Sequence, residues 1–250
     1  MYDDNLIPLN ISPIFSRQRS HMSLLFDQYS SKFNELRDLE QDELPRSLRL
    51  FNIRLRLAAD IQINFKGEIS LTKATDVRET YALIIQLMEA WNAYEAFSHY
   101  AGEVSTHVAK KTSKAKIYSQ TFLTTVGSMQ ILENALAWIK SEYDNNSRFK
   151  KDITQYISRI EQDSQISQRL KDDAKSVLKH LSGEKTISGI ELISLIYAER
   201  NMYYHNGETA KMGMAYSNRK KLIMKFRETL FEHMLKLAIY IIDEQIDGTK

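Results

Sequence analysis

The chain has 250 residues, of which 43% are hydrophobic and 26% are charged, and its formal net charge is +2. Such a chain can bury a sizeable core, as one large domain or two small ones. The absence of cysteine excludes disulfides, thiolate metal sites and a cysteine nucleophile. The sequence contains no run of about 20 uncharged apolar residues, which is the length needed to span a bilayer. Its first residues also lack the basic and apolar regions of a secretory signal. We therefore expect a cytoplasmic protein without a membrane partner.

Helix-breaking residues are scarce. The chain has 8 glycines and 3 prolines, and apolar residues recur at three- and four-residue spacing in most segments, whereas strand-like alternation is nearly absent. The sequence therefore predicts an all-α protein, folded as an antiparallel helical bundle. In chain order, the expected helices cover about 13–40, 45–64, 76–102, 116–143, 148–162 and 166–182, then a helix that ends near 206 and a last one at 216–246.

One apolar stripe of the 76–102 helix leads to a carboxylate. The stripe consists of Val77, Tyr81, Ile84, Met88 and Trp91, and its next step is Glu95. A carboxylate on a core-facing stripe is costly unless it is paired or hydrogen-bonded. We expect Arg200 to be its partner, because a nearby carboxylate can hold a guanidinium in a fixed orientation. The alternative is a purely structural ion pair between two helices.

Two intervals of the chain hold several cations and no acidic residue. The first lies between Glu103 and Glu133, and the second between Glu208 and Glu228. The second interval continues into the start of the last helix, where the macrodipole disfavours cations. A phosphate-bearing partner would explain these basic residues, whereas the alternative is a solvated face of lysines. The candidate phosphate-binding residues are Lys110, Lys111, Lys114, Lys211, Arg219, Lys220 and Lys221.

The stretch AERNMYYHNGE, residues 198–208, closes the helix that ends near 206. Arg200 and His205 are five residues apart, hence roughly 140° apart around the helix and about 7.5 Å along it, so they flank the packed face from two sides. Asn201 falls on that face, where an asparagine needs hydrogen-bond partners. Because Asn206 and Gly207 are typical of a helix C-terminus, His205 lies in the last turn. A histidine there suits proton transfer at neutral pH, but it is also a common helix cap.

The run Arg200-Asn201-Met202-Tyr203-Tyr204-His205 resembles the motif of arginine, polar residue, three further residues and histidine that marks the HEPN superfamily of helical-bundle ribonucleases. The resemblance implies a HEPN-like helical bundle over residues 76–246. Residues 1–70 would then be an N-terminal helical extension, and residues 148–182 a helical insertion.

The resemblance also implies a metal-independent endoribonuclease of the toxin or antiviral-defence type. His205 would transfer protons, Arg200 would stabilise the charge that develops on the phosphate, and Asn201 would orient the reacting groups. Glu95 and Tyr204 would support them. RNA supplies its own nucleophile, the 2′-hydroxyl, so the reaction needs no metal or other cofactor and yields a 2′,3′-cyclic phosphate.

The partners that follow from the resemblance are RNA and a second copy of the chain, because members of this family commonly dimerise so that two motifs line one composite active site. An antitoxin or regulatory protein is a third expected partner. The alternative function is a non-catalytic helical module that keeps the scaffold and binds RNA or a protein partner. No metal is expected, since the chain lacks the repeated pair of glutamate and histidine three apart that marks di-iron bundles.

Overall fold

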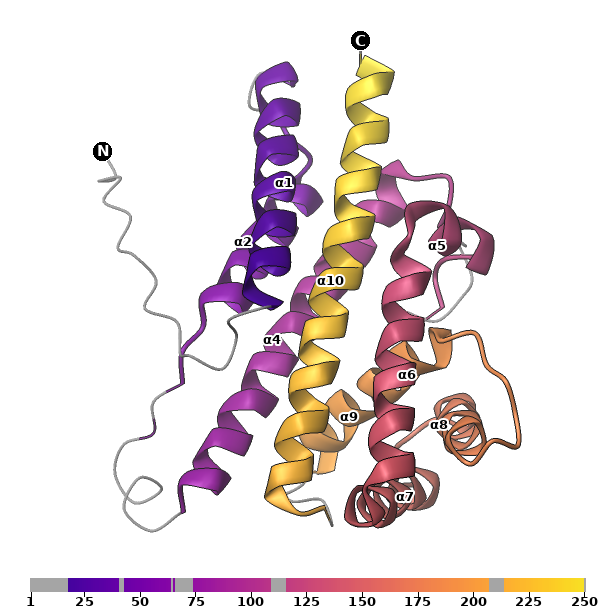
Figure 1. Cartoon of the computed structure of the whole chain (residues 1–250). Helices are drawn as coiled ribbons and strands as arrows, with labels where there is room; N and C mark the ends of the chain where they lie inside the picture. The colour runs from indigo at the N-terminus through magenta and orange to yellow at the C-terminus, as the bar shows by residue number, and fades with distance from the viewer. Residues whose placement is uncertain are drawn as a thin grey trace.

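The computed structural model of the chain describes residues 18–40, 43–63, 65, 74–108, 116–206 and 214–249. Within these ranges there are nine α-helices and no strand, apart from an isolated β-bridge between Val108 and Tyr118. The prediction of an all-α protein is confirmed. The helices, labelled as in Figure 1, are α1 (Gln18–Leu39), α2 (Arg46–Asp60), α4 (Thr75–Val104), α5 (Gln120–Val126), α6 (Ser128–Asn145), α7 (Ser147–Gln162), α8 (Gln168–Leu181), α9 (Ile190–Asn206) and α10 (Tyr216–Thr249).

The long helices pack side by side, and two of the central ones are parallel (Figure 1). Lys220 pairs with Asp76 at 2.6 Å near the starts of α10 and α4. At the other end of both helices, Glu244 lies 3.1 Å from His107, which follows α4. α2 and α6 run in the opposite direction beside them, while α7 and α8 lie across the lower end of the bundle in the view of Figure 1. The expected antiparallel packing therefore holds for α2 and α6 but not for the α4–α10 pair.

The helix expected at 116–143 is divided in two by Gly127. This residue has a φ of 75°, and its N–H donates to the carbonyl of Thr124 at 3.0 Å, which ends α5. Glycine adopts this left-handed conformation without the steric cost that a Cβ imposes. Ser119 caps the start of α5 by accepting from the N–H of Phe122 at 3.2 Å. The chain therefore turns at Gly127 before α6 begins.

The first two helices share the core of the others. Tyr29 of α1 contacts Phe51 of α2 edge to face, with ring centroids 5.6 Å apart. Phe51 in turn lies 5.1 Å from Phe97 of α4, and all three rings belong to one cluster of buried apolar side chains that reaches α10. The helices expected as an N-terminal extension are thus packed into the bundle.

Two buried carboxylates attach α7 and α8 to the rest of the bundle. Asp152 of α7 accepts hydrogen bonds from the N–H of Ala215 at 3.0 Å and from the side-chain amide of Asn218 at 2.8 Å. Its carboxylate thereby caps the start of α10. Asp173 of α8 accepts from the hydroxyl of Ser194 on α9 at 2.7 Å. The segment expected as an insertion is therefore anchored by polar contacts to the two helices that follow it.

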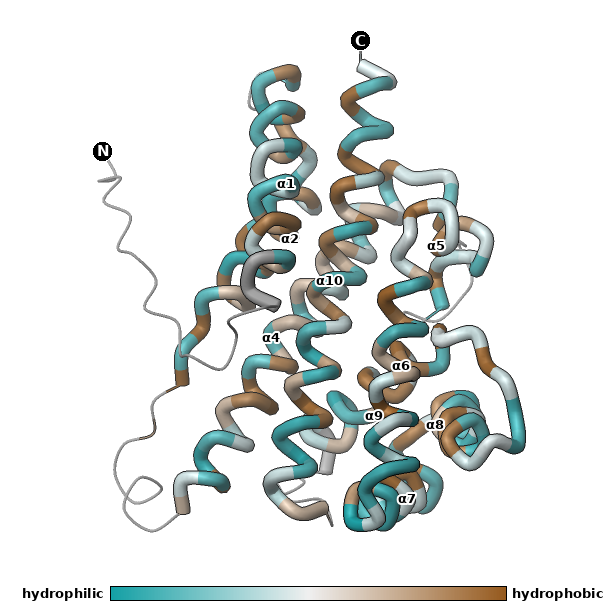
Figure 2. The backbone as a smooth tube through the Cα atoms, viewed as in Figure 1, coloured by the Kyte–Doolittle hydropathy of each residue, from teal (hydrophilic) through white to brown (hydrophobic). Residues whose placement is uncertain are grey.

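Hydrophobic and hydrophilic residues alternate along each helix in Figure 2, as amphipathic helices require. None of the helices in the described ranges combines the length and the apolar character needed to cross a membrane.

His233 of α10 is an ionisable group enclosed in the core. It is 2% exposed, and its ring centroid lies 6.3 Å from that of Tyr94. Burial lowers the pKa of His233 to about 4, against the opposing effect of a hydrogen bond with the backbone of Ser128. Its Nδ1 atom has no hydrogen-bond partner within the described residues. The folded protein therefore keeps this histidine neutral.

We predict that His233 makes the fold sensitive to mild acid. In the unfolded chain the histidine binds a proton below its ordinary pKa of about 6.5, whereas the folded protein excludes that proton down to about pH 4. Stability is therefore complete above pH 6.5 and falls by about 3 kcal/mol as the pH drops to 4. His233→Phe should flatten this part of the curve of unfolding free energy against pH, measured by urea denaturation. His99→Gln, at an exposed position, is the control and should leave the slope unchanged. If His233→Phe had the same slope as the parent protein, the prediction would be contradicted.

Candidate functional site

The C-terminal turns of α9 carry the motif that the sequence singles out. Arg200 Nη1 donates to the side-chain oxygen of Asn201 at 3.2 Å, and the guanidinium lies over the ring of Tyr204, 4.7 Å from its centroid. Tyr204 is 50% exposed and is the one exposed aromatic residue in the described part of the chain. Tyr203 meets it edge to face at 6.2 Å. Arg200, Asn201 and Tyr204 therefore form one small cluster at the surface end of α9.

The guanidinium of Arg200 is positioned without a carboxylate. Its Nε atom is buried and has no hydrogen-bond partner, and among the residues that the structure describes Arg200 forms no ion pair. A guanidinium held by a neutral amide and an aromatic ring keeps its full positive charge for another anion. This arrangement suits the recognition of a phosphate.

Glu95 makes a contact within its own helix that the sequence did not predict. It accepts a hydrogen bond at 3.0 Å from the indole N–H of Trp91 on the preceding turn of α4. Trp91 also stacks on Tyr197 of α9, with ring centroids 4.9 Å apart and an 8° angle between the planes. An aromatic stack therefore joins α4 to α9 at this level.

Among the described residues, no hydrogen bond or ion pair joins Glu95 to Arg200. The predicted contact between Glu95 and Arg200 is not confirmed.

A buried ion pair that the motif did not predict lies directly beside Arg200. Glu199 and Arg219 are both fully buried and pair with each other, linking α9 to α10. Tyr156 of α7 donates to the second oxygen of Glu199 at 2.9 Å, and Arg219 lies over the Tyr156 ring at 5.0 Å. Burial and Glu199 raise the pKa of the Tyr156 hydroxyl well above its usual range. Three helices therefore meet at one set of polar contacts.

The prediction that Arg219 binds RNA at the surface is wrong, because its side chain is 0% exposed and engaged by Glu199. The sequence did contain a sign of this. Arg219 stands three residues before Leu222 and begins the apolar stripe of α10 that continues through Ile223 and Phe226. Glu199 interrupts an apolar stripe of α9 in the same way, and the apolar members of that stripe are Leu192, Leu195, Ile196 and Met202.

Two other described cations of the second basic interval, Lys220 and Lys221, form ion pairs within the chain. Lys220 pairs with Asp76 at 2.6 Å and Glu79 at 2.8 Å, and these hydrogen bonds raise its pKa. Lys221 pairs with Glu142 at 3.2 Å. Their charges are therefore largely balanced by α4 and α6, which weakens the case for a phosphate-binding surface at this point.

Several predicted site residues fall outside the described residues. These are Lys110, Lys111, Lys114 and Lys211, together with the side chain of His205, whose backbone belongs to α9. Their role in phosphate binding or catalysis stays a prediction. In the described ranges, no three side chains among histidine, aspartate and glutamate gather in a way that could hold a metal ion.

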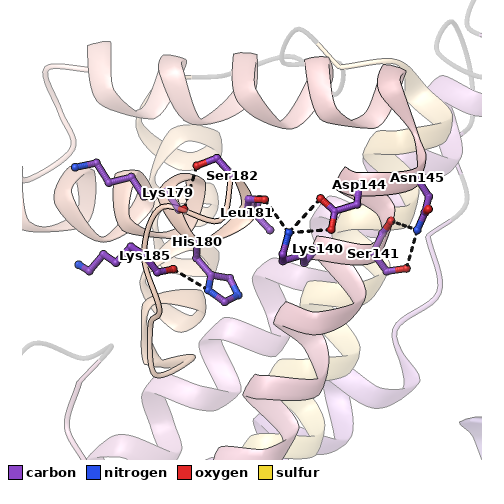
Figure 3. A network of polar contacts seen from close by, with 9 residues as sticks. All are labelled: Lys140, Ser141, Asp144, Asn145, Lys179, His180, Leu181, Ser182 and Lys185. Carbon is purple, nitrogen blue, oxygen red and sulfur yellow. Dashed lines mark hydrogen bonds and ion pairs between the residues drawn. The ribbon is translucent and has the colours of Figure 1, made fainter.

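A hollow of about 510 Å³ lies between α6 and the end of α8 with the segment that follows it, and no residue of the motif lines it. Figure 3 shows that the polar groups around it bind one another. Lys140 Nζ donates to Asp144 at 2.8 Å and to the carbonyl of Leu181 at 3.1 Å, and His180 Nδ1 donates to the carbonyl of Lys185 at 3.2 Å. Since these contacts join α6 to the end of α8 and hold the following loop against α8, they serve the fold.

Comparison with protein-family models, curated proteins and solved structures found no match for this chain. The functional argument therefore depends on the chain's own residues and their geometry.

We predict that Glu199 and Arg219 stabilise the fold only as a pair. Arg219→Met or Glu199→Leu alone should lower the free energy of unfolding by about 3 to 5 kcal/mol, because each leaves a buried charge without its counterpart. The double variant should lose much less than the sum of the two. Urea denaturation measures all three.

The matched control is Lys221→Met, which removes an exposed ion pair from the same helix and should cost about 1 kcal/mol or less. Strictly additive losses in the double variant would show that Glu199 and Arg219 do not act together.

Proposed function

We propose that the protein is a metal-independent endoribonuclease whose active site is the end of α9, with Arg200, Asn201 and His205 as its catalytic residues. The observation that carries the proposal is the cluster of Arg200, Asn201 and Tyr204, in which a surface guanidinium is fixed by neutral groups. The resemblance of residues 200–205 to the HEPN motif supports the same assignment.

The chemistry requires three things of these residues. The 2′-hydroxyl of RNA attacks the adjacent phosphorus, and a proton must leave that hydroxyl while another reaches the departing 5′-oxygen. His205, in the last turn of α9, is assigned the proton transfer, since the helix C-terminus favours its cationic form. Arg200 offers a positive charge for the pentacoordinate phosphate. Asn201 orients Arg200 through their hydrogen bond.

Tyr204 favours an unpaired stretch of RNA as the substrate. Its ring is half exposed, and the face that Arg200 does not cover offers a place for a base to stack. Stacking of this kind needs a base that is free of its helix, so loops and single strands fit better than duplexes.

The second candidate function is a non-catalytic helical module that binds a protein partner. One observation favours it: Arg219, Lys220 and Lys221 are engaged within the chain rather than displayed for RNA. The cleavage experiment below decides between the two.

We predict that the purified protein cleaves single-stranded RNA in excess chelator and spares DNA, which lacks the 2′-hydroxyl. His205→Ala and Arg200→Ala should each reduce cleavage about 100-fold or more. Both should stay folded by circular dichroism, because Arg200 has no ion pair within the described residues that its loss would break. His99→Ala provides a control at an exposed histidine outside the motif. Undiminished cleavage by folded His205→Ala would refute the assignment.

We further predict that the aromatic ring at position 204 contributes to substrate binding. In the His205→Ala background, which separates binding from cleavage, Tyr204→Leu should weaken binding of single-stranded RNA by about tenfold, since a stacked base contributes about 1 to 3 kcal/mol. Tyr204→Phe keeps the ring and should bind as the parent does. Fluorescence anisotropy with a labelled oligonucleotide measures both. Equal loss in the leucine and phenylalanine variants would point to the hydroxyl instead of the ring.

A further inference from the structure

Exposed apolar side chains gather on the first two helices. Of the six large hydrophobic residues that the described residues expose, five lie on α1 and α2. Three of them share one face of α2: Leu50 is 48% exposed, Ile53 63% and Leu57 44%. On a helix at about 100° per residue, these three positions fall within a 60° arc. They face away from the core, since the buried residues of α2 are Leu48, Phe51, Leu55 and Ala58.

Opposite charges flank this apolar stripe along the helix axis. Arg46 and Arg49 lie on the same face toward the start of α2, and Asp60 lies on it at the end. All three are exposed, and none forms an ion pair within the described part of the chain. The remaining arginines of α2 are engaged elsewhere: Arg54 pairs with Glu89 at 3.6 Å, and Arg56 lies over the Phe26 ring at 5.7 Å.

We propose that this face of α2 binds the same face of a second copy of the chain across a two-fold axis. The pattern is nearly symmetric about Ile53, with Leu50 and Leu57 on either side and Arg46 and Asp60 each seven residues away. Antiparallel packing of two such helices sets Ile53 against itself and Leu50 of one copy against Leu57 of the other. It also brings Arg46 of each copy to Asp60 of the other.

The charges favour a second copy over other occupants. An anionic lipid surface or an acidic helix would attract Arg46 and Arg49 but repel Asp60, which lies on the same face. In a two-fold dimer, the arginine of each copy meets the aspartate of the other, so charges of both signs are paired. Because α2 has 15 residues, or a length of about 22 Å, its face alone is smaller than the roughly 800 Å² per partner of a typical stable interface. The dimer is therefore reversible and depends on concentration.

This dimer differs from the composite-site dimer that the family resemblance implies. On α4, Gln86 donates to the carbonyl of Ile61 just after α2, and Glu89 contacts α2 through Arg54. Trp91, which contacts α9, points to the other side of α4. A dimer through α2 therefore holds the two α9 motifs apart, and its existence does not depend on the proposed nuclease activity.

Sedimentation velocity of the full chain over a concentration series tests the proposal. The parent should shift from monomer to dimer as concentration rises. Ile53→Glu should lower the association constant about tenfold or more, because it places two carboxylates together at the two-fold axis. Leu24→Glu, at a site on α1 that is 54% exposed, is the matched control and should dimerise as the parent does.

A charge exchange identifies the partner as a second copy. Arg46→Asp and Asp60→Arg should each weaken the dimer, most at low salt, since each leaves like charges opposed at both ends of the interface. The R46D/D60R double variant should restore it, because the exchanged charges pair again. Both substitutions agree with the macrodipole of α2, so folding should survive them.

Three outcomes would overturn the proposal. They are a monomer at every concentration, a dimer that Ile53→Glu leaves intact, and a double variant that is weaker than either single one. Binding of the monomer to anionic vesicles that is abolished by Ile53→Glu would assign the stripe to a lipid surface instead.

Discussion

The contact between Glu199 and Arg219 determines how α7, α9 and α10 are arranged. Two fully buried charges are stable only because each neutralises the other and Tyr156 supplies a further hydrogen bond. The requirement that these groups meet fixes the rotation of α9 about its own axis relative to α7 and α10. Since Arg200 is the next residue along α9, that rotation turns its side chain away from the buried pair and toward the surface. The inner arginine is paired within the core, whereas the outer one contacts only Asn201 and Tyr204 among the described residues.

Local spacing in the sequence was sufficient to place most helices, because each buries one face and the scarce glycines and prolines leave few places to stop. Gly127 shows where this reasoning reaches its limit: a glycine within a helical pattern does not itself reveal whether the chain turns there. Its φ of 75° places it in the left-handed region, where it ends α5. Spacing also could not reveal that α4 and α10 are parallel, since direction is decided by contacts between helices far apart in the sequence.

The site was predictable in part. The motif residues Arg200 and Tyr204 do lie together, because residues four apart on a helix are neighbours, whereas the hydrogen bond between Arg200 and the adjacent Asn201 did not follow from spacing. Glu95 was assigned to Arg200 on the assumption that a core-facing carboxylate needs a cation, but the sequence did not predict its hydrogen bond with the indole N–H of Trp91 on its own helix. Arg219 was assigned to the surface with its lysine neighbours, although its position on the apolar stripe of α10 indicated burial. Patterns within one helix predicted which of its residues lie together. They did not predict which residue of another helix would be the partner.

The central position of α10 affects how the chain folds while it is being synthesised. This helix contacts α1, α4, α5 and α6, yet it follows all of them along the chain and leaves the ribosome after they do. Until it does, the apolar faces that these helices turn toward α10 remain exposed to water. Helices α1, α2 and α4 can associate early, but the nascent chain must hold an unfinished core through the synthesis of some 140 further residues. During that interval the growing chain is most exposed to aggregation and most dependent on chaperones.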